Sequence, residues 1–257
     1  MIAAGRVHVV VTRPAAQGAV WVERLRERGI DAESLPLIEI APVEELAPLA
    51  AAWRAIGDVR LVVFVSVNAV EGFFAARPAS STWPDAVEAA APGPGTARAL
   101  RDAGLAGTAI VSPPVDAGRF DSEALWALLA ARAWHGARVL VVRGDGGRDW
   151  LGDRLRAGGA DVVEVRAYRR LSPSFVGTMR ERLEAALANV ATVWLFSSSE
   201  AIANLARATG PERWHGARAI ATHARIAARA RSLGFGTVRE AAPTLDAVVA
   251  CIQSIEP

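Results

Sequence analysis

The chain alternates short, uninterrupted apolar runs with longer segments in which apolar residues recur every three or four positions. Such runs are typical of strands buried on both faces of a parallel sheet, and the longer segments of amphipathic helices covering that sheet. The clearest unit is 139–168, where a strand at 139–142 precedes a polar, Gly-rich turn at 143–147. A helix with Leu151 and Leu155 on one face then ends at Gly158-Gly159, and a second strand follows at 162–168. This pattern predicts an α/β fold.

The same alternation continues along most of the chain. Helix N-caps are expected at Asp121 and Thr244, and Val20, Trp21 and Leu25 are expected to face inward from the first helix. The predicted strands are 7–11, 60–65, 85–90, 108–111, 192–196, 217–221 and 237–240, and an extended segment broken by Pro36 and Pro42 covers 31–40. The helices for which both ends are predicted are 17–28, 46–55, 96–103, 122–131, 175–188 and 244–254.

The order of elements is that of an internal repeat. VVVTRP, a helix and RGIDAESLPLIEI match VLVVRGDGG, a helix and GGADVVEVRAYRR, and LVVFVSVNAVEGFFA matches TVWLFSSSEAIANLA. The repeat predicts two similar, flavodoxin-like α/β domains with mostly parallel sheets and a cleft between them. If the long second strands, 33–40 and 162–171, pair as a two-strand linker, one domain is 1–37 plus 171–257 and the other 38–170. A simple split into halves is the alternative.

Polar residues gather where the predicted strands end. Ligands of parallel α/β sheets bind at the carboxyl ends of strands, and helix N-termini there attract anions. Helix capping explains any one of these residues alone, but together they offer many hydrogen-bond donors and few acceptors, which suits a ligand with several carboxylates. The candidate binding residues are Thr12, Arg13, Ser66, Asn68, Gly95, Thr96, Arg143, Gly144, Asp145, Gly146, Gly147, Ser197, Ser198, Ser199, Thr222, His223 and Arg225.

Composition narrows the possible partners. All 29 basic residues are arginine and the net charge is +2, so an acid-binding site must use Arg, hydroxyls or backbone amides, and no nucleic-acid surface is indicated. The single cysteine, Cys251, excludes a disulfide framework and a Cys-based zinc site. No apolar stretch reaches membrane-spanning length, and a cytoplasmic protein without a membrane partner is expected.

Common cofactor motifs are missing. The glycines at 144, 146 and 147 do not have GxGxxG spacing, there is no GxxxxGK[ST], and the four histidines do not pair with carboxylates at metal-ligand spacing. Neither a metal nor an organic cofactor is therefore expected. Two functions remain open for such a site: a two-domain sensor that closes on an anion without chemistry, and a nucleotide-sugar enzyme with the Gly-rich loop on a phosphate.

Several motifs resemble the uroporphyrinogen-III synthase family over nearly the whole chain: VTRP, VSVNAV, GPGTARAL, FDSEAL, VLVVRGDGGRDWL…GGADVVEVRAYRR, FSSSEAI and THARIAARARSLGF. The resemblance implies a cofactor-free lyase. Its substrate, hydroxymethylbilane, loses its terminal hydroxyl as water and closes into uroporphyrinogen III, with inversion of the last ring through a spiro intermediate. The product leads to haem, sirohaem and corrins.

The resemblance also implies a role for Tyr168, the only tyrosine in the chain. Its phenol is expected at the mouth of the cleft, where it would hydrogen-bond the departing hydroxyl; the alternative is a strand aromatic packed in the core. Arg13 and Arg143 occupy equivalent positions in the repeats and are expected to bind carboxylates, unless each forms an ion pair within its own domain. The expected assembly is a monomer that receives its substrate from hydroxymethylbilane synthase.

Overall fold

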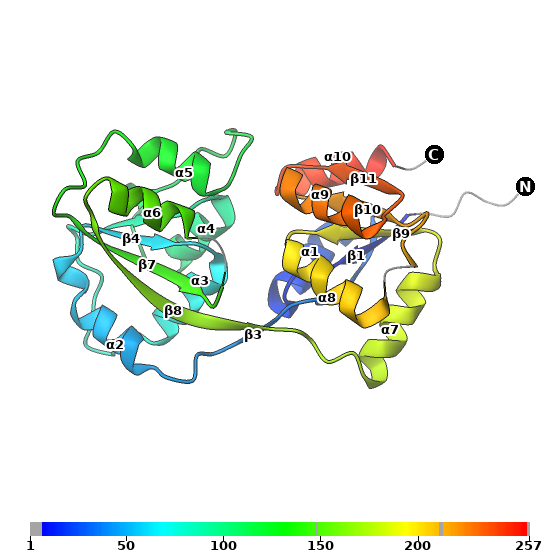
Figure 1. The fold of residues 1–257 in the computed structure, drawn as a ribbon, viewed down its shortest axis with the longest axis horizontal. Helices are drawn as coiled ribbons and strands as arrows, with labels where there is room; N and C mark the ends of the chain where they lie inside the picture. The colour runs from blue at the N-terminus through cyan, green and yellow to red at the C-terminus, as the bar shows by residue number, and fades with distance from the viewer. Residues whose placement is uncertain (1–6, 147–148, 211–212, 256–257) are drawn as a thin grey trace, which may run out of the picture. The chain divides into compact units, whose positions relative to one another are not determined.

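The computed structural model describes residues 7–146, 149–210 and 213–255, which form two compact α/β units (Figure 1). Unit 1 consists of Met1–Glu39 and Leu171–Pro257, and unit 2 of Ile40–Arg170. The chain therefore passes between units after Glu39 and again after Arg170, where the sequence-based boundaries are 37/38 and 170/171.

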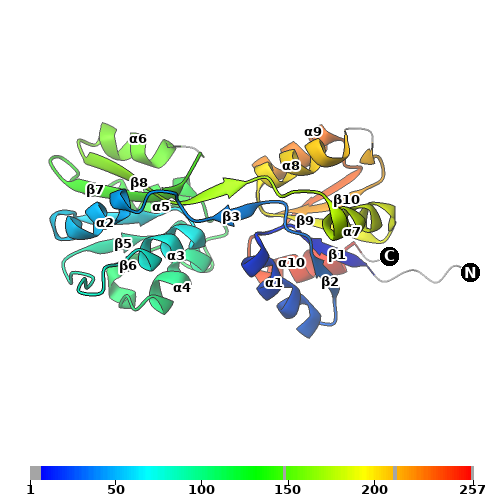
Figure 2. The same cartoon turned by 90° about the horizontal axis from the view of Figure 1, so that it is seen from below.

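Unit 1 contains a five-stranded sheet in the order β11-β10-β9-β1-β2, with every neighbouring pair parallel. Helices α1 and α10 lie on one face of the sheet, and α8 and α9 on the other (Figure 2). The switch point of this doubly wound order lies between β1 and β9. The elements are β1 (His8–Val11), α1 (Ala15–Glu27), β2 (Asp31–Ser34), α7 (Gly177–Ala188), β9 (Thr192–Phe196), α8 (Ser199–Thr209), β10 (Arg218–Ala221), α9 (Ala224–Leu233), β11 (Thr237–Glu240) and α10 (Leu245–Gln253).

Unit 2 contains a six-stranded sheet in the order β3-β8-β7-β4-β5-β6. Strands β8, β7, β4, β5 and β6 occupy the same relative places as β2, β1, β9, β10 and β11 of unit 1, so the switch point lies between β7 and β4. The predicted fold of two similar α/β domains with mostly parallel sheets is thereby confirmed. The elements are β3 (Glu39–Ala41), α2 (Ala47–Arg54), η1 (Ile56–Asp58), β4 (Leu61–Phe64), α3 (Val67–Ala75), β5 (Glu88–Ala90), α4 (Pro94–Asp102), η2 (Gly107–Ala109), β6 (Ile110–Val111), α5 (Ser122–Leu129), β7 (Arg138–Gly144), α6 (Trp150–Ala157) and β8 (Asp161–Leu171).

The apolar runs are continuous because both faces of each sheet are buried. In β4, Leu61 and Val63 pack with the core beneath α5 and α6, whereas Val62 and Phe64 pack with the core beneath α3 and α4. All four side chains are fully buried. This alternation follows from the two-residue period of a strand, and it explains why no polar position interrupts the run.

The prediction of one long strand at 33–40 is wrong. Strand β2 ends at Ser34 and pairs with β1, whereas β3 begins at Glu39 and lies beside β8. Pro36 stands between them and has no N–H to donate to a ladder. The backbone of Leu37 instead donates to the carbonyl of Thr12 (3.3 Å) and accepts from the side-chain amide of Asn204 (2.6 Å). Only the short β3 segment therefore pairs with the long strand β8.

Both helix caps predicted from sequence are present. An oxygen of Asp121 accepts from the Ala124 N–H at 2.8 Å, and the hydroxyl of Thr244 accepts from the Ala247 N–H at 3.4 Å.

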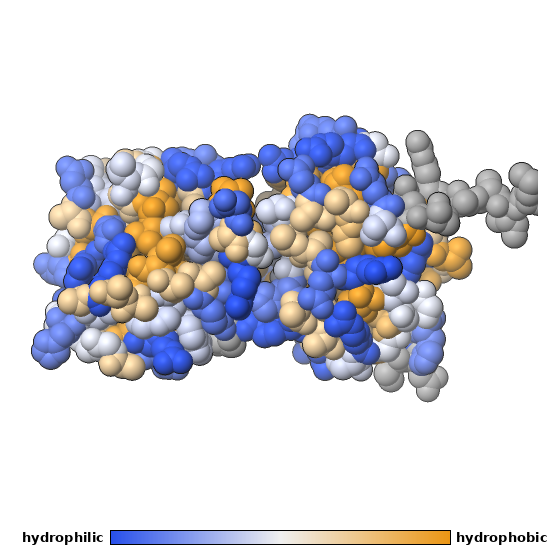
Figure 3. Space-filling model, turned by 90° about the horizontal axis from the view of Figure 1, so that it is seen from above, coloured by the Kyte–Doolittle hydropathy of each residue, from blue (hydrophilic) through white to orange (hydrophobic). Residues whose placement is uncertain are grey.

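On the face drawn in Figure 3, hydrophilic residues surround smaller apolar areas on each unit. None of the helices in the described segments combines the length and apolar character needed to cross a bilayer.

Candidate functional site

A β-bulge aims Tyr168 into the core of unit 2. The register between β7 and β8 pairs Arg143 with Arg166 but Gly144 with Tyr168, so one residue of β8 is extra at this point. In a regular strand Ala167 and Tyr168 would face opposite sides, yet both belong to the core beneath α3 and α4. Such bulges re-aim a side chain. Tyr168 is consequently only 2% exposed, which differs from the expected position at the mouth of a cleft.

Two glycines make room for this arrangement. A Cβ atom on Gly144 would lie 2.6 Å from Cζ of the Tyr168 ring, so the ring lies flat against the β7 backbone. A Cβ atom on Gly72 of α3 would lie 2.2 Å from the carbonyl oxygen of Ala167, the neighbour of Tyr168. Helix α3 therefore approaches β8 at the bulge, and both contacts require a residue without a side chain.

The hydroxyl of Tyr168 has two polar neighbours. Ser66 Oγ lies 3.0 Å from it, and a guanidinium nitrogen of Arg170 donates to it, also at 3.0 Å. The Arg170 guanidinium lies 5.5 Å from the centroid of the Tyr168 ring. Ser66 caps α3, because its Oγ accepts from the Ala69 N–H at 3.2 Å. The fold thus joins the end of β4 to the end of β8, 102 residues apart in sequence.

The loop after β7 is tied to the same place. The Asp145 N–H donates to the Tyr168 carbonyl (3.3 Å), and an oxygen of Asp145 accepts from the Arg170 N–H (2.7 Å). Through these two hydrogen bonds Asp145 links the end of β7 to the end of β8. Gly146 is exposed with a φ of 71°, a conformation that favours glycine, and Gly147 lies outside the described residues.

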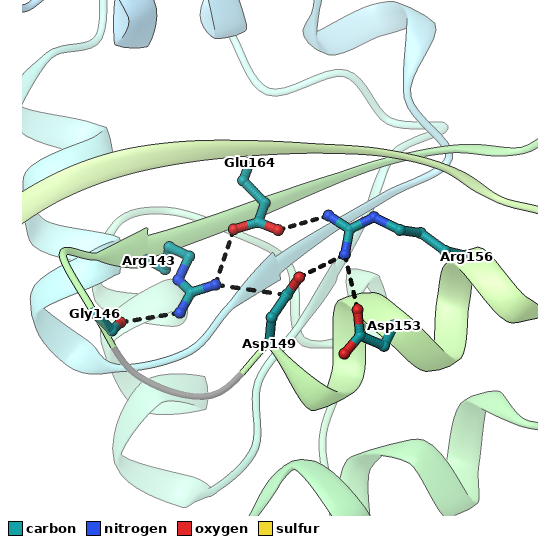
Figure 4. Close-up of polar contacts among 6 residues, drawn as sticks. All are labelled: Arg143, Gly146, Asp149, Asp153, Arg156 and Glu164. Carbon is teal, nitrogen blue, oxygen red and sulfur yellow. Dashed lines mark hydrogen bonds and ion pairs between the residues drawn. The ribbon is translucent and has the colours of Figure 1, made fainter.

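Arg143 is held within unit 2 by an ion-pair network (Figure 4). Its guanidinium contacts Glu164 (2.8 Å) and Asp149 (3.5 Å) and donates to the Gly146 carbonyl (2.9 Å). Arg156 bonds the same two carboxylates. Burial alone raises the pKa of Glu164, but hydrogen bonds from Arg156 and Arg143 outweigh it and leave the pKa below its ordinary value. The side chain of Arg143 is 13% exposed, and these contacts favour the intradomain alternative over substrate binding.

We expect Arg143→Ala to lower the free energy of unfolding by about 1–2 kcal/mol, because hydrogen bonds to charged partners are lost from a mostly buried site. Arg138→Ala on the same strand removes only an exposed pair with Asp161 and should cost less than about 0.5 kcal/mol. Chemical denaturation measures both. A large rise in KM for Arg143→Ala without loss of stability would instead assign Arg143 to the substrate.

The remaining candidates of unit 2 lie at the starts of α3 and α4. Asn68 is partly buried in the first turn of α3, after the Ser66 cap. Thr96 is buried and Gly95 exposed in the first turn of α4. A Cβ atom on Gly95 would lie 3.8 Å from a methyl of Val67, so the two helix starts are adjacent. Their N-terminal amides face the carboxyl ends of β4 and β5.

Arg13 of unit 1 differs from Arg143 in its surroundings. Its Nε atom is enclosed and has no hydrogen-bond partner in the described part of the chain, and its guanidinium lies 4.4 Å from the centroid of the Trp21 ring. Burial lowers the pKa of Arg13 to about 10. Arg13 stands two residues after the end of β1, next to the switch point between β1 and β9. A buried guanidinium without a carboxylate is costly, and an anionic ligand would compensate it.

The other polar residues of unit 1 also take part in the fold. The Thr12 hydroxyl donates to the Leu195 carbonyl (2.8 Å), which links β1 to β9. Ser198 caps α8 by accepting from the Glu200 N–H (3.1 Å), and His223 caps α9 through Nδ1. Capping was the alternative interpretation for these residues, but a hydroxyl that accepts from a backbone amide keeps its own hydrogen to donate. Of the rest, Ser197 is partly buried, Thr222 buried, and Ser199 and Arg225 exposed.

Arg170 and Gly72 are site residues that the sequence did not single out. Arg170 stands two positions after Tyr168 on β8, and this period-two spacing is the signal that places both side chains on one side. Gly72 has no comparable signal, because its role depends on the approach of α3 to the bulge. Among the described residues, no group of three or more His, Cys, Asp or Glu is placed to hold a metal ion.

Fold and site together define a doubly wound α/β protein of two units, with hydrogen-bond donors at the carboxyl ends of its strands. The particular family is shown by sequence: the family model described as "Uroporphyrinogen-III synthase HemD" matches residues 19–250. The chain therefore belongs to the uroporphyrinogen-III synthase family.

Individual relatives agree with this assignment. Uroporphyrinogen-III synthase of Escherichia coli K12 is 36% identical over 172 residues, which are 66% of this chain and 67% of that protein. The protein of the same name from Salmonella typhimurium LT2 is 33% identical over 238 residues, 91% of this chain and 94% of that protein.

Solved structures share the fold at lower identity. A mutant uroporphyrinogen III synthase from the extremely thermophilic bacterium Thermus thermophilus superposes with a TM-score of 0.61 at 19% identity, covering 97% of each chain. Uroporphyrinogen-III synthetase from Helicobacter pylori 26695 gives 0.62 at 17% identity, covering 98% of this chain and 100% of that one. At such identities the likeness shows the two-unit α/β architecture.

Proposed function

We propose that this protein converts hydroxymethylbilane to uroporphyrinogen III, with loss of water and inversion of the last ring through a spiro intermediate. One observation carries the proposal: a chain of this family holds its only tyrosine against a serine hydroxyl at the switch point of a doubly wound sheet. In such sheets the switch point is where ligands bind. No cofactor is needed for the proposed reaction.

Catalysis would combine positioning with proton donation. Holding the two reacting ends of a flexible chain together offsets roughly 7–11 kcal/mol in favourable systems. The donors at the ends of β1, β4, β5 and β9 would bind the acetate and propionate groups of the substrate. Tyr168 would supply the proton with which the terminal hydroxyl leaves as water, a general-acid role.

Arg13 is the strongest candidate for a carboxylate contact, because the described part of unit 1 gives its Nε no partner. We expect Arg13→Met to raise KM by about ten-fold, the loss of one charge-assisted hydrogen bond, with a smaller effect on turnover. The variant should not lose thermal stability, since it removes a largely buried charge to which the described residues provide no counter-ion. Steady-state kinetics and thermal melts check both. An unchanged KM together with a lower melting temperature would show that Arg13 serves the fold.

The alternative is a two-domain protein that binds an anionic ligand without chemistry. Incubation with freshly made hydroxymethylbilane, followed by oxidation and separation of the porphyrin isomers, distinguishes the two. The proposal expects the type III isomer, with wild-type protein well below substrate concentration. The binding alternative expects only the uninverted isomer that forms in buffer.

We further propose that the protein acts as a monomer in the cytoplasm and takes its substrate from hydroxymethylbilane synthase. The support is chemical: its substrate is a reactive open chain that cyclises without help, so transfer from the preceding enzyme limits loss. Light scattering measures the mass of the particle, and mixing the two proteins with a trap for free substrate tests the transfer.

A further inference from the structure

The hydrogen bonds around Tyr168 have one arrangement that pairs every enclosed donor. Arginine can only donate, so the bond from Arg170 occupies a lone pair of the Tyr168 oxygen. If Ser66 also donated to that oxygen, the O–H of Tyr168 would have to point towards another acceptor. Tyr168 is only 2% exposed, so water is not available to accept it. The described residues offer the phenol no third partner. Buried donors are almost always paired, so the Tyr168 O–H donates to Ser66 Oγ.

This assignment leaves the Ser66 hydrogen free to act. Ser66 Oγ then accepts from the phenol of Tyr168 (3.0 Å) and from the Ala69 N–H (3.2 Å), which uses both of its lone pairs. Its own O–H must point away from these partners. Ser66 is partly exposed and follows Val65, which is 37% exposed, whereas Tyr168 is enclosed. A ligand at the end of β4 therefore meets the Ser66 hydroxyl before it meets the phenol.

We propose that Ser66 donates the hydrogen bond to the leaving hydroxyl of the substrate, and that Tyr168 passes its proton to Ser66. This inference rests on the proposed function and changes which side chain touches the reacting group. Ser66 is then the catalytic residue, and Tyr168 stands behind it as the source of the proton. Arg170 is a positioning residue for the phenol.

The step balances without any further reactant. The C–O bond of the hydroxymethyl group breaks with its electron pair on oxygen. The pyrrole nitrogen lone pair forms a C=N bond within the ring, and the displaced ring C=C pair forms a double bond to the former hydroxymethyl carbon. The departing oxygen takes the Ser66 proton and leaves as water, while Ser66 takes the proton of Tyr168. The phenolate lies 3.0 Å from the Arg170 guanidinium and next to the start of α3, and both stabilise negative charge. The proton lost when the closed ring regains aromaticity restores Tyr168.

A double-substitution cycle under single-turnover conditions tests the relay. Ser66→Ala and Tyr168→Phe should each slow the reaction by about ten-fold or more, and the double variant should be within about two-fold of the slower single variant. Two independent donors would instead multiply, to about a hundred-fold. Ser66→Thr keeps a hydroxyl and a cap and should recover most of the rate. A Ser66→Ala variant as fast as wild type, or multiplying losses, would overturn the relay.

A proton inventory, in which the rate is measured in mixtures of light and heavy water, distinguishes the relay from a purely structural role. For wild-type protein, a plot of rate against deuterium fraction should be curved, because two protons move in the step. For Tyr168→Phe, the same plot should be a straight line, because one proton moves. Thr244→Ala removes a helix cap of the same kind in unit 1 and should keep full turnover, which controls for lost capping. If wild-type protein makes no type III isomer, the proposed function fails; if it does and the wild-type line is straight, only the relay fails.

Discussion

Tyr168→Phe is expected to slow turnover by about ten-fold or more, at the low end of general-acid effects, while the product stays type III. The phenol supplies a proton, but the rest of the site still folds the substrate. The variant loses hydrogen bonds to Ser66 and Arg170 and should lose about 1 kcal/mol of stability. Rates from stopped incubations and thermal melts give both quantities.

Trp83→Phe is the matched control for this variant. It removes one hydrogen bond of a partly buried aromatic side chain in unit 2, from Trp83 Nε1 to the Val87 carbonyl (2.9 Å), and neither of these atoms takes part in the hydrogen bonds of the Tyr168 hydroxyl. It should lose similar stability and keep its turnover. If Tyr168→Phe behaves the same way, the tyrosine belongs to the core and not to the reaction.

Gly144→Ala is expected to reduce turnover at least as much as Tyr168→Phe. The added Cβ would lie 2.6 Å from Cζ and 2.7 Å from Cε2 of Tyr168, so the ring or the β7 backbone must shift, and the 3.0 Å contact between the phenol and Ser66 is disturbed. Overpacking of this kind costs about 1–3 kcal/mol of stability. Denaturation and single-turnover rates measure the two effects together.

Two further variants separate the clash from a general effect of the alanine. Gly57→Ala adds a Cβ with no atom within 4 Å and should leave both stability and turnover near wild type. Adding Tyr168→Leu to Gly144→Ala removes the ring that the new Cβ meets. The double variant should be more stable than Gly144→Ala alone, but its turnover should not increase. Full turnover in Gly144→Ala would mean that the position of the Tyr168 ring does not matter to the reaction.

The sequence predicts the sheets well because they depend on local patterns. The strands at 192–196 and 237–240 have the predicted ends, and the repeat correctly anticipates two similar units with mostly parallel sheets. Helix α1 is less accurate: Val20, expected inward, is 52% exposed. The buried face of α1 instead contains Gly18, where a Cβ would lie 2.4 Å from Ser34 Oγ. A glycine that allows close packing of a helix is not counted as apolar when the buried face is predicted from the spacing of apolar residues.

The site is harder to predict because it depends on register between distant strands. Tyr168 could be assigned to a strand end, but the bulge that turns it inward needs Gly144 on β7 and Gly72 on α3. Arg143 could be expected to find an intradomain carboxylate, yet its partners are Glu164 on β8 and Asp149 before α6, and not the nearby Asp145. A one-residue shift changes which side chains meet, and no local pattern specifies it.

The central claim is that this chain is an enzyme that inverts the last ring of its substrate. The most direct measurement is the fraction of type III isomer formed from hydroxymethylbilane as the wild-type protein is diluted far below the substrate. We expect mostly type III product, with many molecules formed for each molecule of protein. Mostly uninverted product at every dilution, with the protein folded, would contradict it.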